Sequence, residues 1–374
     1  MPRLHYFYPE NDLALARDIP RYTAPPAAVR LRRSGANLPF FYSDAGDEVL
    51  TGGTDTRWLD TLRRRLGIQG GVYRHDNTDL APAPWGWSKA ARQTFIDDGF
   101  PVSALPSDET LARLRMLSHR RTASEASRLL ADRLSFAIAP AAAELASVEE
   151  IYSFIGSQPA GIVLKLPWSS SGRGLVFTDP ATAATQKAMF EGMLRRQGTL
   201  MGEPCHRKVL DFAMLFTMKD GKCSFDGYSL FENSRLGNYS GNILAPQPEI
   251  KRRIAVHVAS AQLDAVEKAL PEVLEELIGE AYEGPLGVDM LAASGAPYKL
   301  APVVEINLRM TMGHVCRIFY DRYVAPGATG TFTIENARTA GIFDADTFDG
   351  RILHGIVDLA QPGADFSFIA RIGG

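Results

Sequence analysis

Cysteine is scarce in this sequence: Cys205, Cys223 and Cys316 are its only three, and no two of them form a Cys-x-x-Cys pair. This spacing indicates neither a disulfide framework nor a zinc site. Long apolar runs are also missing, since no stretch reaches the roughly 20 residues that a membrane-spanning helix needs. The N-terminus has no long apolar run after its basic residue. We therefore expect a cytoplasmic protein without a membrane partner.

An excess of one charge is missing as well. Lys and Arg total 40 against 43 Asp and Glu, a formal charge of −3, which does not favour a nucleic-acid surface. The P-loop G-x-x-x-x-G-K-[ST], H-E-x-x-H and G-x-S-x-G motifs are absent too. What is present is a hydrophobic content of 45% with 22% charged residues, typical of a globular chain, and 374 residues, enough for about two or three domains.

The first third of the chain has an α/β pattern. Residues 4–8 and 71–73 read as strands and 58–66 as a helix, while 39–43 is predicted as a further strand and 81–88 as a Pro/aromatic loop. Two polar residues, Asn11 and Asp12, follow the first strand at the edge where open α/β sheets place ligands. They are ligand candidates, although a plain helix-cap role is favoured. For Trp85 and Trp87, packing over a neighbouring domain is favoured over stacking on a substrate.

The rest of the chain alternates helical and strand patterns. Helices are predicted over 107–128 with an interruption at 118–122, over 148–155, over 181–197, and over 250–282 with a division at Pro271. Strands 208–218 and 223–231 flank Asp220-Gly221, the strongest hairpin signal in the sequence. A polar loop over 231–248 follows, and strands are predicted at 287–293 and 298–308.

Residues 161–178 look like a phosphate clamp. A short apolar strand carrying Lys165 meets a second apolar run through a loop of backbone N–H groups, hydroxyls and a guanidinium, all suited to polyphosphate. That loop contains Ser169, Ser170, Ser171, Gly172, Arg173 and Gly174. The segment alone is equally compatible with a β-hairpin that has a polar loop and a lysine on its wet face.

A second constellation lies on strand 303–309. Alternation places Glu305, Asn307 and Arg309 on one face, and the neighbouring strand has a lone Asp289 among apolar residues. If the two strands pair, the carboxylates come close enough to repel unless a cation lies between them, and oxygen ligands favour Mg²⁺ or Mn²⁺. The alternative is an amphipathic edge strand with a surface ion pair between Glu305 and Arg309. The clamp and the acidic strands together indicate a nucleotide-dependent phosphoryl-transfer enzyme.

With these motifs the chain resembles the ATP-grasp superfamily. The glycine-rich hairpin loop is matched by Lys165 and 169–174, and the acidic strand pair by GVDM at 287–290 and VVEINLR at 303–309. The segment 200–205, with Glu203 and Cys205, falls at the family's adenine hinge, and Asp211 matches the acidic residue after it. The smaller lobe's lysine has no counterpart; Arg120 occupies its place, with Arg121 as the rival.

The resemblance implies a fold and an activity. The fold would be an α/β (α+β) ATP-grasp, with a Rossmann-like pre-ATP-grasp domain at 1–116, a small lobe at 117–200 and a large lobe at 201–374. The activity would be ATP-dependent, ADP-forming C–N ligation of small-molecule carboxylate and amine substrates through an acyl phosphate. The alternatives are a kinase of the same fold and a non-catalytic nucleotide-binding module. Whether the protein forms a homodimer stays open.

The resemblance also implies roles for residues. Asp289, Glu305 and Asn307 would bind Mg²⁺ (or Mn²⁺), Lys165 and Arg120 would neutralise ATP phosphates, and Arg309 would stabilise the acyl phosphate. The loop 169–174 would close over the γ-phosphate, and Glu203, Cys205 and Asp211 would contact the nucleoside. For the acceptor, the sequence offers a set of polar residues after the hairpin and after Arg309: Glu232, Asn233, Ser234, Arg235, Asn238, Tyr239, Asn242, Thr311 and His314. A helix cap is the favoured role of His314.

Overall fold

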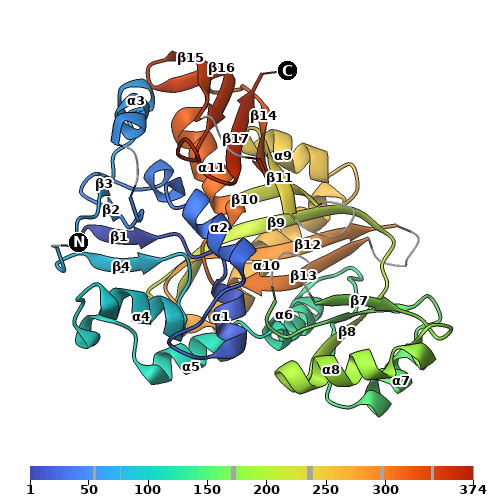
Figure 1. The fold of residues 1–374 in the computed structure, drawn as a ribbon. Coiled ribbons are helices and arrows are strands. Elements are labelled where there is room, and N and C mark those ends of the chain that lie inside the picture. The colour runs from blue at the N-terminus through green and yellow to red at the C-terminus, as the bar shows by residue number, and fades with distance from the viewer. Residues whose placement is uncertain are drawn as a thin grey trace.

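A computed structural model describes residues 1–53, 56–75, 77–169, 174–233, 239–294, 299–337 and 341–373. The predicted residues Ser170, Ser171, Gly172 and Arg173 of the clamp, and Ser234, Arg235 and Asn238 of the polar loop, lie outside these ranges. Three sheets organise the chain, and helices pack against them (Figure 1). No helix among the described residues combines the length and the apolar character needed to cross a membrane.

The N-terminal unit contains a parallel sheet in the order β3-β2-β1-β4, which agrees with the predicted α/β pattern. Its strands are β1 (Arg3–Tyr6), β2 (Glu48–Val49), β3 (Gly71–Val72) and β4 (Ala81–Pro84). Its helices are α1 (Asn11–Arg17), α2 (Pro26–Ser34), α3 (Thr56–Leu66), α4 (Lys89–Asp97) and α5 (Asp108–Leu117), with 3₁₀ turns at Leu38–Phe41 and Val102–Ala104.

Two predictions for this unit are wrong. Residues 39–43 do not form a strand. Pro39, Phe40 and Phe41 belong to the 3₁₀ turn Leu38–Phe41, in which both phenylalanines are fully buried, so tertiary packing decides the conformation of this short apolar run. Residues 81–84 are not a loop but form strand β4, which pairs with β1 at the edge of the sheet. An edge strand can contain proline, because the N–H groups on its outer side need no partner strand. Trp85 after it is buried in a core shared with the C-terminal strands, as the packing interpretation predicted.

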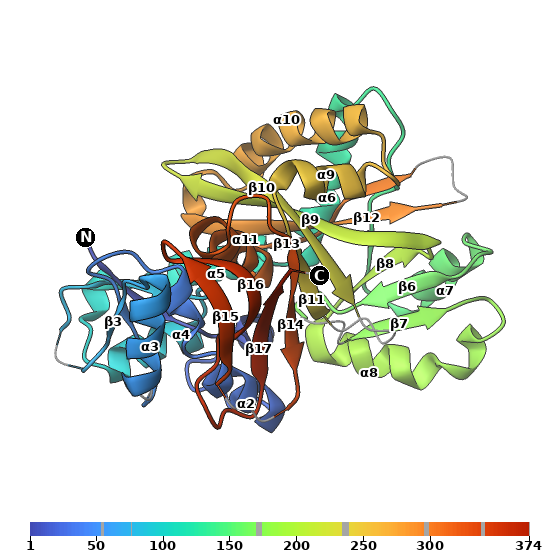
Figure 2. The ribbon, with the colours of Figure 1, turned by 90° about the horizontal axis from the view of Figure 1, so that it is seen from above.

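A smaller lobe is built on an antiparallel sheet in the order β5-β8-β6-β7 and projects away from the remaining chain (Figure 1, Figure 2). Its elements are β5 (Ala143–Leu145), α7 (Val148–Gly156), β6 (Ile162–Lys165), β7 (Leu175–Thr178), the 3₁₀ turn Ala183–Thr185, α8 (Lys187–Gln197) and β8 (Leu200–Pro204). The helix predicted over 181–197 therefore begins only at Lys187. The strand–loop–strand prediction is confirmed, since β6 pairs with β7 on either side of the clamp loop.

The third sheet is antiparallel, in the order β13-β12-β9-β10-β11-β14-β17-β16-β15. Its strands are β9 (Lys208–Lys219), β10 (Lys222–Asn233), β11 (Tyr239–Leu244), β12 (Gly284–Ala293), β13 (Leu300–Asn307), β14 (Gly330–Glu335), β15 (Phe343–Phe348), β16 (Arg351–Asp358) and β17 (Ser367–Ile372). The helices around it are α6 (Arg120–Arg133), α9 (Gln247–Ile254), α10 (Ser260–Leu277) and α11 (Met312–Tyr323), with a 3₁₀ turn at Gly279–Ala281. Helices α6, α9 and α10 cover one face of β9, β10, β12 and β13 (Figure 2).

The predicted hairpin is confirmed, because Asp220 and Gly221 both have positive φ and β9 pairs with β10 directly across them. Two other predictions need correction. The segment 231–248 is not one loop, since it contains the end of β10 and the whole of β11. Pro271 does not divide two helices either: it lies inside α10, and the division falls at 255–259.

Candidate active site

The alternation of strand residues gives the large sheet one apolar and one polar face. On β9, Phe212 and Met214 are buried against the helices, whereas Asp211 and Ala213, which alternate with them, line a pocket on the opposite face. The clamp-bearing small lobe closes the other side of this pocket. The pocket is therefore positioned by the sheet order, which places β9, β12 and β13 side by side.

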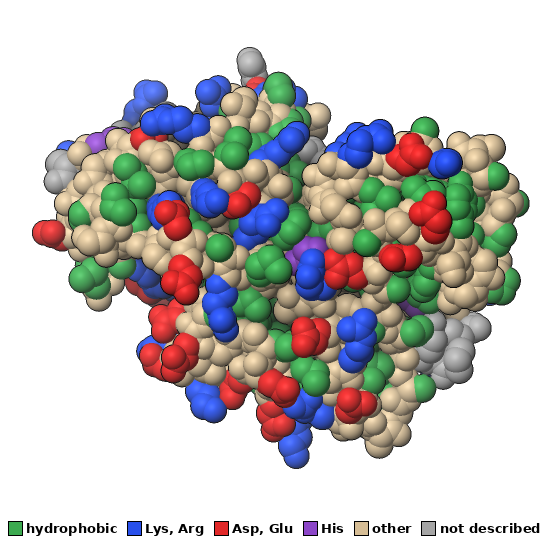
Figure 3. Space-filling view, turned by 90° about the horizontal axis from the view of Figure 1, so that it is seen from below, with side chains coloured by type: hydrophobic (Ala, Val, Ile, Leu, Met, Phe, Trp, Pro, Cys, Tyr) green, Lys and Arg blue, Asp and Glu red, His purple; other side chains and the backbone are tan. Residues whose placement is uncertain are grey.

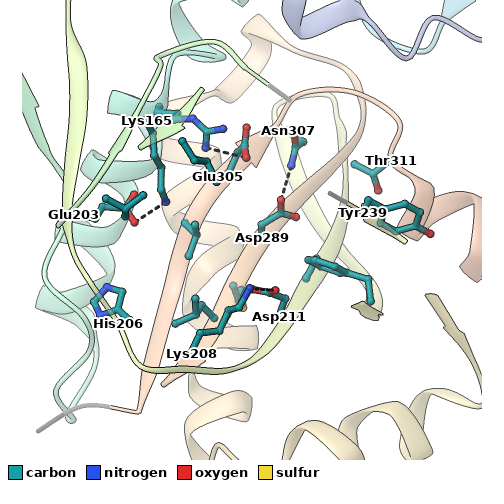
Figure 4. Close-up of a pocket in the computed structure, with 18 of the residues that line it drawn as sticks. Lys165, Glu203, His206, Lys208, Asp211, Tyr239, Asp289, Glu305, Asn307 and Thr311 are labelled. Carbon is teal, nitrogen blue, oxygen red and sulfur yellow. Dashed lines mark hydrogen bonds and ion pairs between the residues drawn. The ribbon is translucent and has the colours of Figure 1, made fainter. Parts of the chain in front are cut away.

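The pocket has a volume of about 370 Å³. In Figure 4, Lys165, Glu203 and His206 lie at one end of the pocket and Tyr239 and Thr311 at the other. Asp289, Glu305 and Asn307 lie between the two ends. The described residues that line it are Arg120, Val163, Lys165, Leu175, Phe177, Glu203, Pro204, Cys205, His206, Lys208, Asp211, Ala213, Ser229, Phe231, Tyr239, Asn242, Asp289, Met290, Leu291, Val304, Glu305, Asn307, Arg309, Thr311, Met312 and Gly313. The site residues predicted from the clamp strand, the hinge and the acidic strands thus meet in one cavity.

Asp289 and Glu305 lie directly opposite each other on paired strands, as the sequence predicted. The amide Nδ2 of Asn307 donates to Asp289 Oδ2 over 3.3 Å (Figure 4). Burial is the main reason that the pKa of Asp289 is raised, and the nearby Glu305 carboxylate adds to it. Because the two carboxylates lie close together and burial disfavours the charge on Asp289, a bound cation would stabilise both in their charged form.

Every Lys and Arg among the described lining residues is paired with a carboxylate. The pairs are Lys165 Nζ with Glu203 Oε2 at 2.6 Å, Lys208 Nζ with Asp211 Oδ2 at 2.6 Å, Arg120 Nη1 with Glu305 Oε2 at 2.9 Å, and Arg309 Nη2 with Asp12 Oδ2 at 2.7 Å. The alternative interpretation, a surface ion pair between Glu305 and Arg309, is therefore wrong, because each has another partner.

The two candidate arginines at the start of α6 point to different places. Arg120 is 8% exposed; its Nε donates to Leu166 O and its Nη2 to Ser169 Oγ, so it joins the base of the clamp loop to Glu305. Arg121 instead pairs with Glu144 at the surface and does not line the pocket. Of the two, Arg120 is the residue placed at the pocket.

Arg309 is held on several sides. Its Nε and Nη2 donate to the Asp12 carboxylate, Nη2 also donates to Asn307 Oδ1, and Nη1 donates to Met310 O. The favoured cap role of Asn11 and Asp12 is wrong. The N-cap residue of α1 is Glu10, and it makes no side-chain cap hydrogen bond. Asp12 instead brings the N-terminal unit to the edge of the pocket.

The acceptor candidates divide into those at the pocket and those outside it. Tyr239 O–H donates to Asn242 Oδ1, and Asn242 Nδ2 donates to Ser229 Oγ, a line of neutral groups along one end of the pocket. Glu232 is exposed and does not line it. Thr311 caps α11 by accepting from the His314 N–H, so the cap role predicted for His314 belongs to Thr311.

The loop that carries the clamp has a fixed base. Trp168 N–H donates to Gln197 Oε1 and its C=O accepts from Gln197 Nε2, both over 2.9 Å, while the indole N–H donates to the backbone O of Arg115. On the other side of the loop, Gly174 has φ 77°, and a Cβ there would lie 2.6 Å from Leu166. Both sides of the loop are thus constrained.

Sequence reasoning missed some lining residues. Ser229 lies in an apolar stretch of β10, and no motif distinguishes it. Lys208 was recognisable only through Asp211, three positions later, and the apolar side chains Val163, Leu175 and Phe177 read as ordinary strand residues. Among the described residues, no cluster of three or more His, Cys, Asp or Glu side chains could bind a metal ion. The candidate metal ligands, two carboxylates and the amide of Asn307, were therefore predicted only from the pairing of their strands.

Comparison with protein-family models and with curated proteins finds no match. Solved structures do match. A biotin carboxylase from Campylobacter jejuni superposes with a TM-score of 0.55 at 11% identity, over 100% of this chain and 87% of its own. The biotin carboxylase domain of 2-oxoglutarate carboxylase from Hydrogenobacter thermophilus gives 0.53 at 12% identity, over 100% and 86%. Pyruvate carboxylase from Rhizobium etli gives 0.52 at 16% identity, over 78% of this chain and 28% of its own.

These neighbours define the class of the fold: the chain has the ATP-grasp fold, as its motifs predicted. The fold of this chain is similar over its whole length to the folds of the two biotin carboxylase structures.

Proposed function

We propose that this protein is an ATP- and Mg²⁺-dependent ligase that joins a carboxylate to an amine and releases ADP and phosphate. The observation that carries the proposal is the opposition of Asp289 and Glu305 across paired strands, with Asn307 beside them, in a pocket that also contains Lys165 and Arg120. The shared fold supports it, because the two biotin carboxylases were solved as an ATP complex and with MgADP and bicarbonate.

The ion pairs in the pocket explain how it would accept a triphosphate. Phosphate oxygens would replace Glu203 and Glu305 as partners of Lys165 and Arg120. The released Glu305 would then be free to bind a cation together with Asp289. The cation would then compensate Glu305 in place of Arg120, so this carboxylate is not left alone beside Asp289.

The residues present fit a magnesium ion. Asp289, Glu305 and Asn307 offer oxygen ligands. Burial raises the pKa of Asp289, and the Glu305 carboxylate adds to it, so a bound cation would favour the charged form of both carboxylates. When bound, Mg²⁺ would neutralise charge on the phosphates. The apolar side chains Val163 and Phe177 line the pocket on the small-lobe side together with Cys205, and a nucleotide base would pack against them.

In the proposed reaction, a substrate carboxylate oxygen attacks the γ-phosphorus and the bond to the ADP oxygen breaks, giving an acyl phosphate. An amine then attacks the carbonyl carbon. The C–N bond forms, the C–O bond to phosphate breaks, and the proton lost by nitrogen leaves with the phosphate. Arg309 would stabilise negative charge on the carbonyl oxygen, because its guanidinium is already oriented by Asp12 and Asn307.

The experiment is turnover of the purified protein with ATP, Mg²⁺ and pools of carboxylic acids and amines. We expect ADP, phosphate and a mass-detected amide, all absent with the Glu305→Gln variant. AMP and pyrophosphate as products would overturn the acyl-phosphate route. ADP formation without any need for an amine would indicate a kinase, and nucleotide binding without turnover would indicate a binding module.

A further inference from the structure

Thr311 lies on the pocket face of the large sheet, close to the acidic strands. It lines the main pocket and follows Arg309 by two residues (Figure 4). Gly287 alternates in phase with Asp289 on β12, so a Cβ at this glycine would project on the pocket face. There it would lie 3.0 Å from Cγ2 and 3.6 Å from Oγ1 of Thr311. The threonine side chain therefore occupies the position next to Asp289 along the strand, about 7 Å away.

The hydrogen bonds of His314 determine where the hydroxyl proton of Thr311 lies. The ring Nε2 is 3.4 Å from the backbone O of Phe216, which can only accept, so Nε2 carries the ring proton. Burial, above all, lowers the pKa of His314 to about 4, which keeps its imidazole neutral at neutral pH. The other ring nitrogen, Nδ1, is therefore an acceptor, and it accepts the Thr311 O–H over 2.8 Å.

Thr311 Oγ1 is consequently an acceptor toward the pocket and not a donor. A hydroxyl oxygen has two lone pairs. One of them accepts the backbone N–H of His314 over 3.3 Å, which caps α11, and no other described residue donates to the second. A substrate atom that contacts this oxygen must therefore be an N–H or O–H donor, because an oxygen without a proton would place its lone pair against that of Thr311.

The neutral side chains at this end of the pocket do not reverse that requirement. Tyr239 O–H donates to Asn242 Oδ1, and the Asn242 amide donates to Ser229 Oγ and to Leu230 O. The protons of Tyr239 and Asn242 are thus already used within the protein. This end of the pocket therefore favours a substituent that brings its own proton.

We propose that Thr311 is a specificity-determining residue for the acid substrate, and that this acid has an N–H or O–H donor on the carbon beside its carboxyl group. The inference rests on the proposed ligase function and narrows its carboxylate substrate. Arg309 would bind the carbonyl oxygen, and Thr311, two residues further on, would accept from the neighbouring hydroxyl or amino group. 2-Hydroxy and 2-amino acids meet this requirement, whereas unsubstituted acids and acids with an ether oxygen at that carbon do not.

Turnover of the purified protein with ATP, Mg²⁺ and hydroxylamine tests this on acids of one carbon skeleton: 2-hydroxybutanoate, 2-aminobutanoate, 2-methoxybutanoate and butanoate. Hydroxylamine attacks the carbonyl carbon of the acyl phosphate, the C–O bond to phosphate breaks, and the resulting hydroxamate is measured by mass. We expect kcat/KM to be at least about tenfold higher for the hydroxy and amino acids than for the other two, because these leave the acceptor of Thr311 without a donor.

Two variants assign this preference to the Thr311 oxygen. Thr311→Val keeps the shape and removes the acceptor, so the ratio of kcat/KM for 2-hydroxybutanoate and butanoate should fall to within about twofold of one. Thr311→Ser keeps the oxygen and should retain the preference. The ratio is the readout because the loss of a helix cap would lower the rates with all the acids together. Ser107→Ala removes the cap of α5 outside the pocket wall and should leave the ratio unchanged.

Equal kcat/KM for 2-hydroxybutanoate and butanoate would overturn the inference, and so would a preference that Thr311→Val retains. If none of these acids reacts, the acid identified from the substrate pools decides. A substrate without a donor beside its carboxyl group removes the assignment of Thr311 and leaves the ligase proposal intact, whereas a substrate with one supports it. The absence of ADP formation with every pool overturns the ligase proposal itself.

Discussion

The carboxylate of Asp12 and the guanidinium of Arg309 form a close ion pair across 297 positions of sequence, with Nε within 3.1 Å of both carboxylate oxygens and Nη2 2.7 Å from Oδ2. Each side chain is less than 15% exposed. The pair joins the first helix of the N-terminal unit to the residue that follows β13. The N-terminal unit therefore holds Arg309, a lining residue of the pocket, in place.

Breaking this pair should reduce stability and turnover together. Asp12→Asn leaves the buried Arg309 charge without its counter-ion, and we expect the free energy of unfolding to fall by about 3 kcal/mol. In the double variant Asp12→Asn/Arg309→Gln the loss should be smaller than the sum of the single losses, because the second change removes the unpaired charge. Urea unfolding of the four proteins measures this, and additive losses would show that the pair is not coupled.

Glu305→Gln should abolish Mg²⁺-dependent turnover and leave the fold intact. The amide keeps the size of the side chain but lacks the charge needed beside Asp289, so we expect a loss of at least about a hundredfold in ATP hydrolysis or ligation. Glu144→Gln is the matched control, since Glu144 also pairs with an arginine, Arg121, but at the surface. Turnover of Glu305→Gln at the wild-type rate would remove the metal assignment.

ATP binding should depend strongly on Mg²⁺. Without the metal, phosphates can take Arg120 only by leaving Glu305 without a cation beside Asp289. We expect the Kd of ATP in EDTA to be at least about tenfold higher than in Mg²⁺, measured by calorimetry. Equal affinities in both buffers would mean that the nucleotide phosphates do not displace these carboxylates.

The adjacent arginines of α6 offer an internal comparison. Arg120→Ala should weaken MgATP binding by about tenfold or more, because it removes the proposed phosphate partner and the hydrogen bond to Ser169. Arg121→Ala, with the same change in charge one residue away, should have the affinity of the wild type. If the two variants behave alike, the effect belongs to the overall charge and not to the pocket.

Stability should fall between about pH 6.5 and pH 4, in part through His314. Burial, mainly, lowers the pKa of His314 to about 4, so the folded state favours neutral imidazole while the unfolded chain takes up a proton near pH 6.5. The contribution of neutral His314 to the free energy of unfolding is thus fully present above pH 6.5. It is lost as the pH falls towards 4, by about 2–3 kcal/mol. Urea midpoints of His314→Gln should decline less steeply with acid than those of the wild type, and parallel profiles would contradict this assignment.

Local patterns predicted the elements on which the pocket is built. Strand alternation and the Asp220-Gly221 turn identified β9 and β10, and alternation on β13 led to the correct pairing of Asp289 with Glu305. These features succeed because their causes are close in sequence: the period of a strand and the φ preference of a turn.

The failures have the opposite origin. Phe40 and Phe41 form a 3₁₀ turn because a core shared with distant strands buries them, and Pro271 remains inside α10 because tertiary packing tolerates it there. No local rule connects Asp12 to Arg309, or distinguishes Arg120 from Arg121 at the pocket. Such partners are decided by which segments the fold brings together.

The anchorage of Trp168 has a mechanical consequence. Gln197 fixes its backbone within the small lobe, while its indole is bound to the carbonyl of Arg115, in the last helix of the N-terminal unit. Trp168 is thus tied both to the small lobe and to the N-terminal unit. A rotation of the small lobe relative to α5 would have to strain the hydrogen bond between the Trp168 indole and Arg115, so the force would reach the unit that contains Asp12.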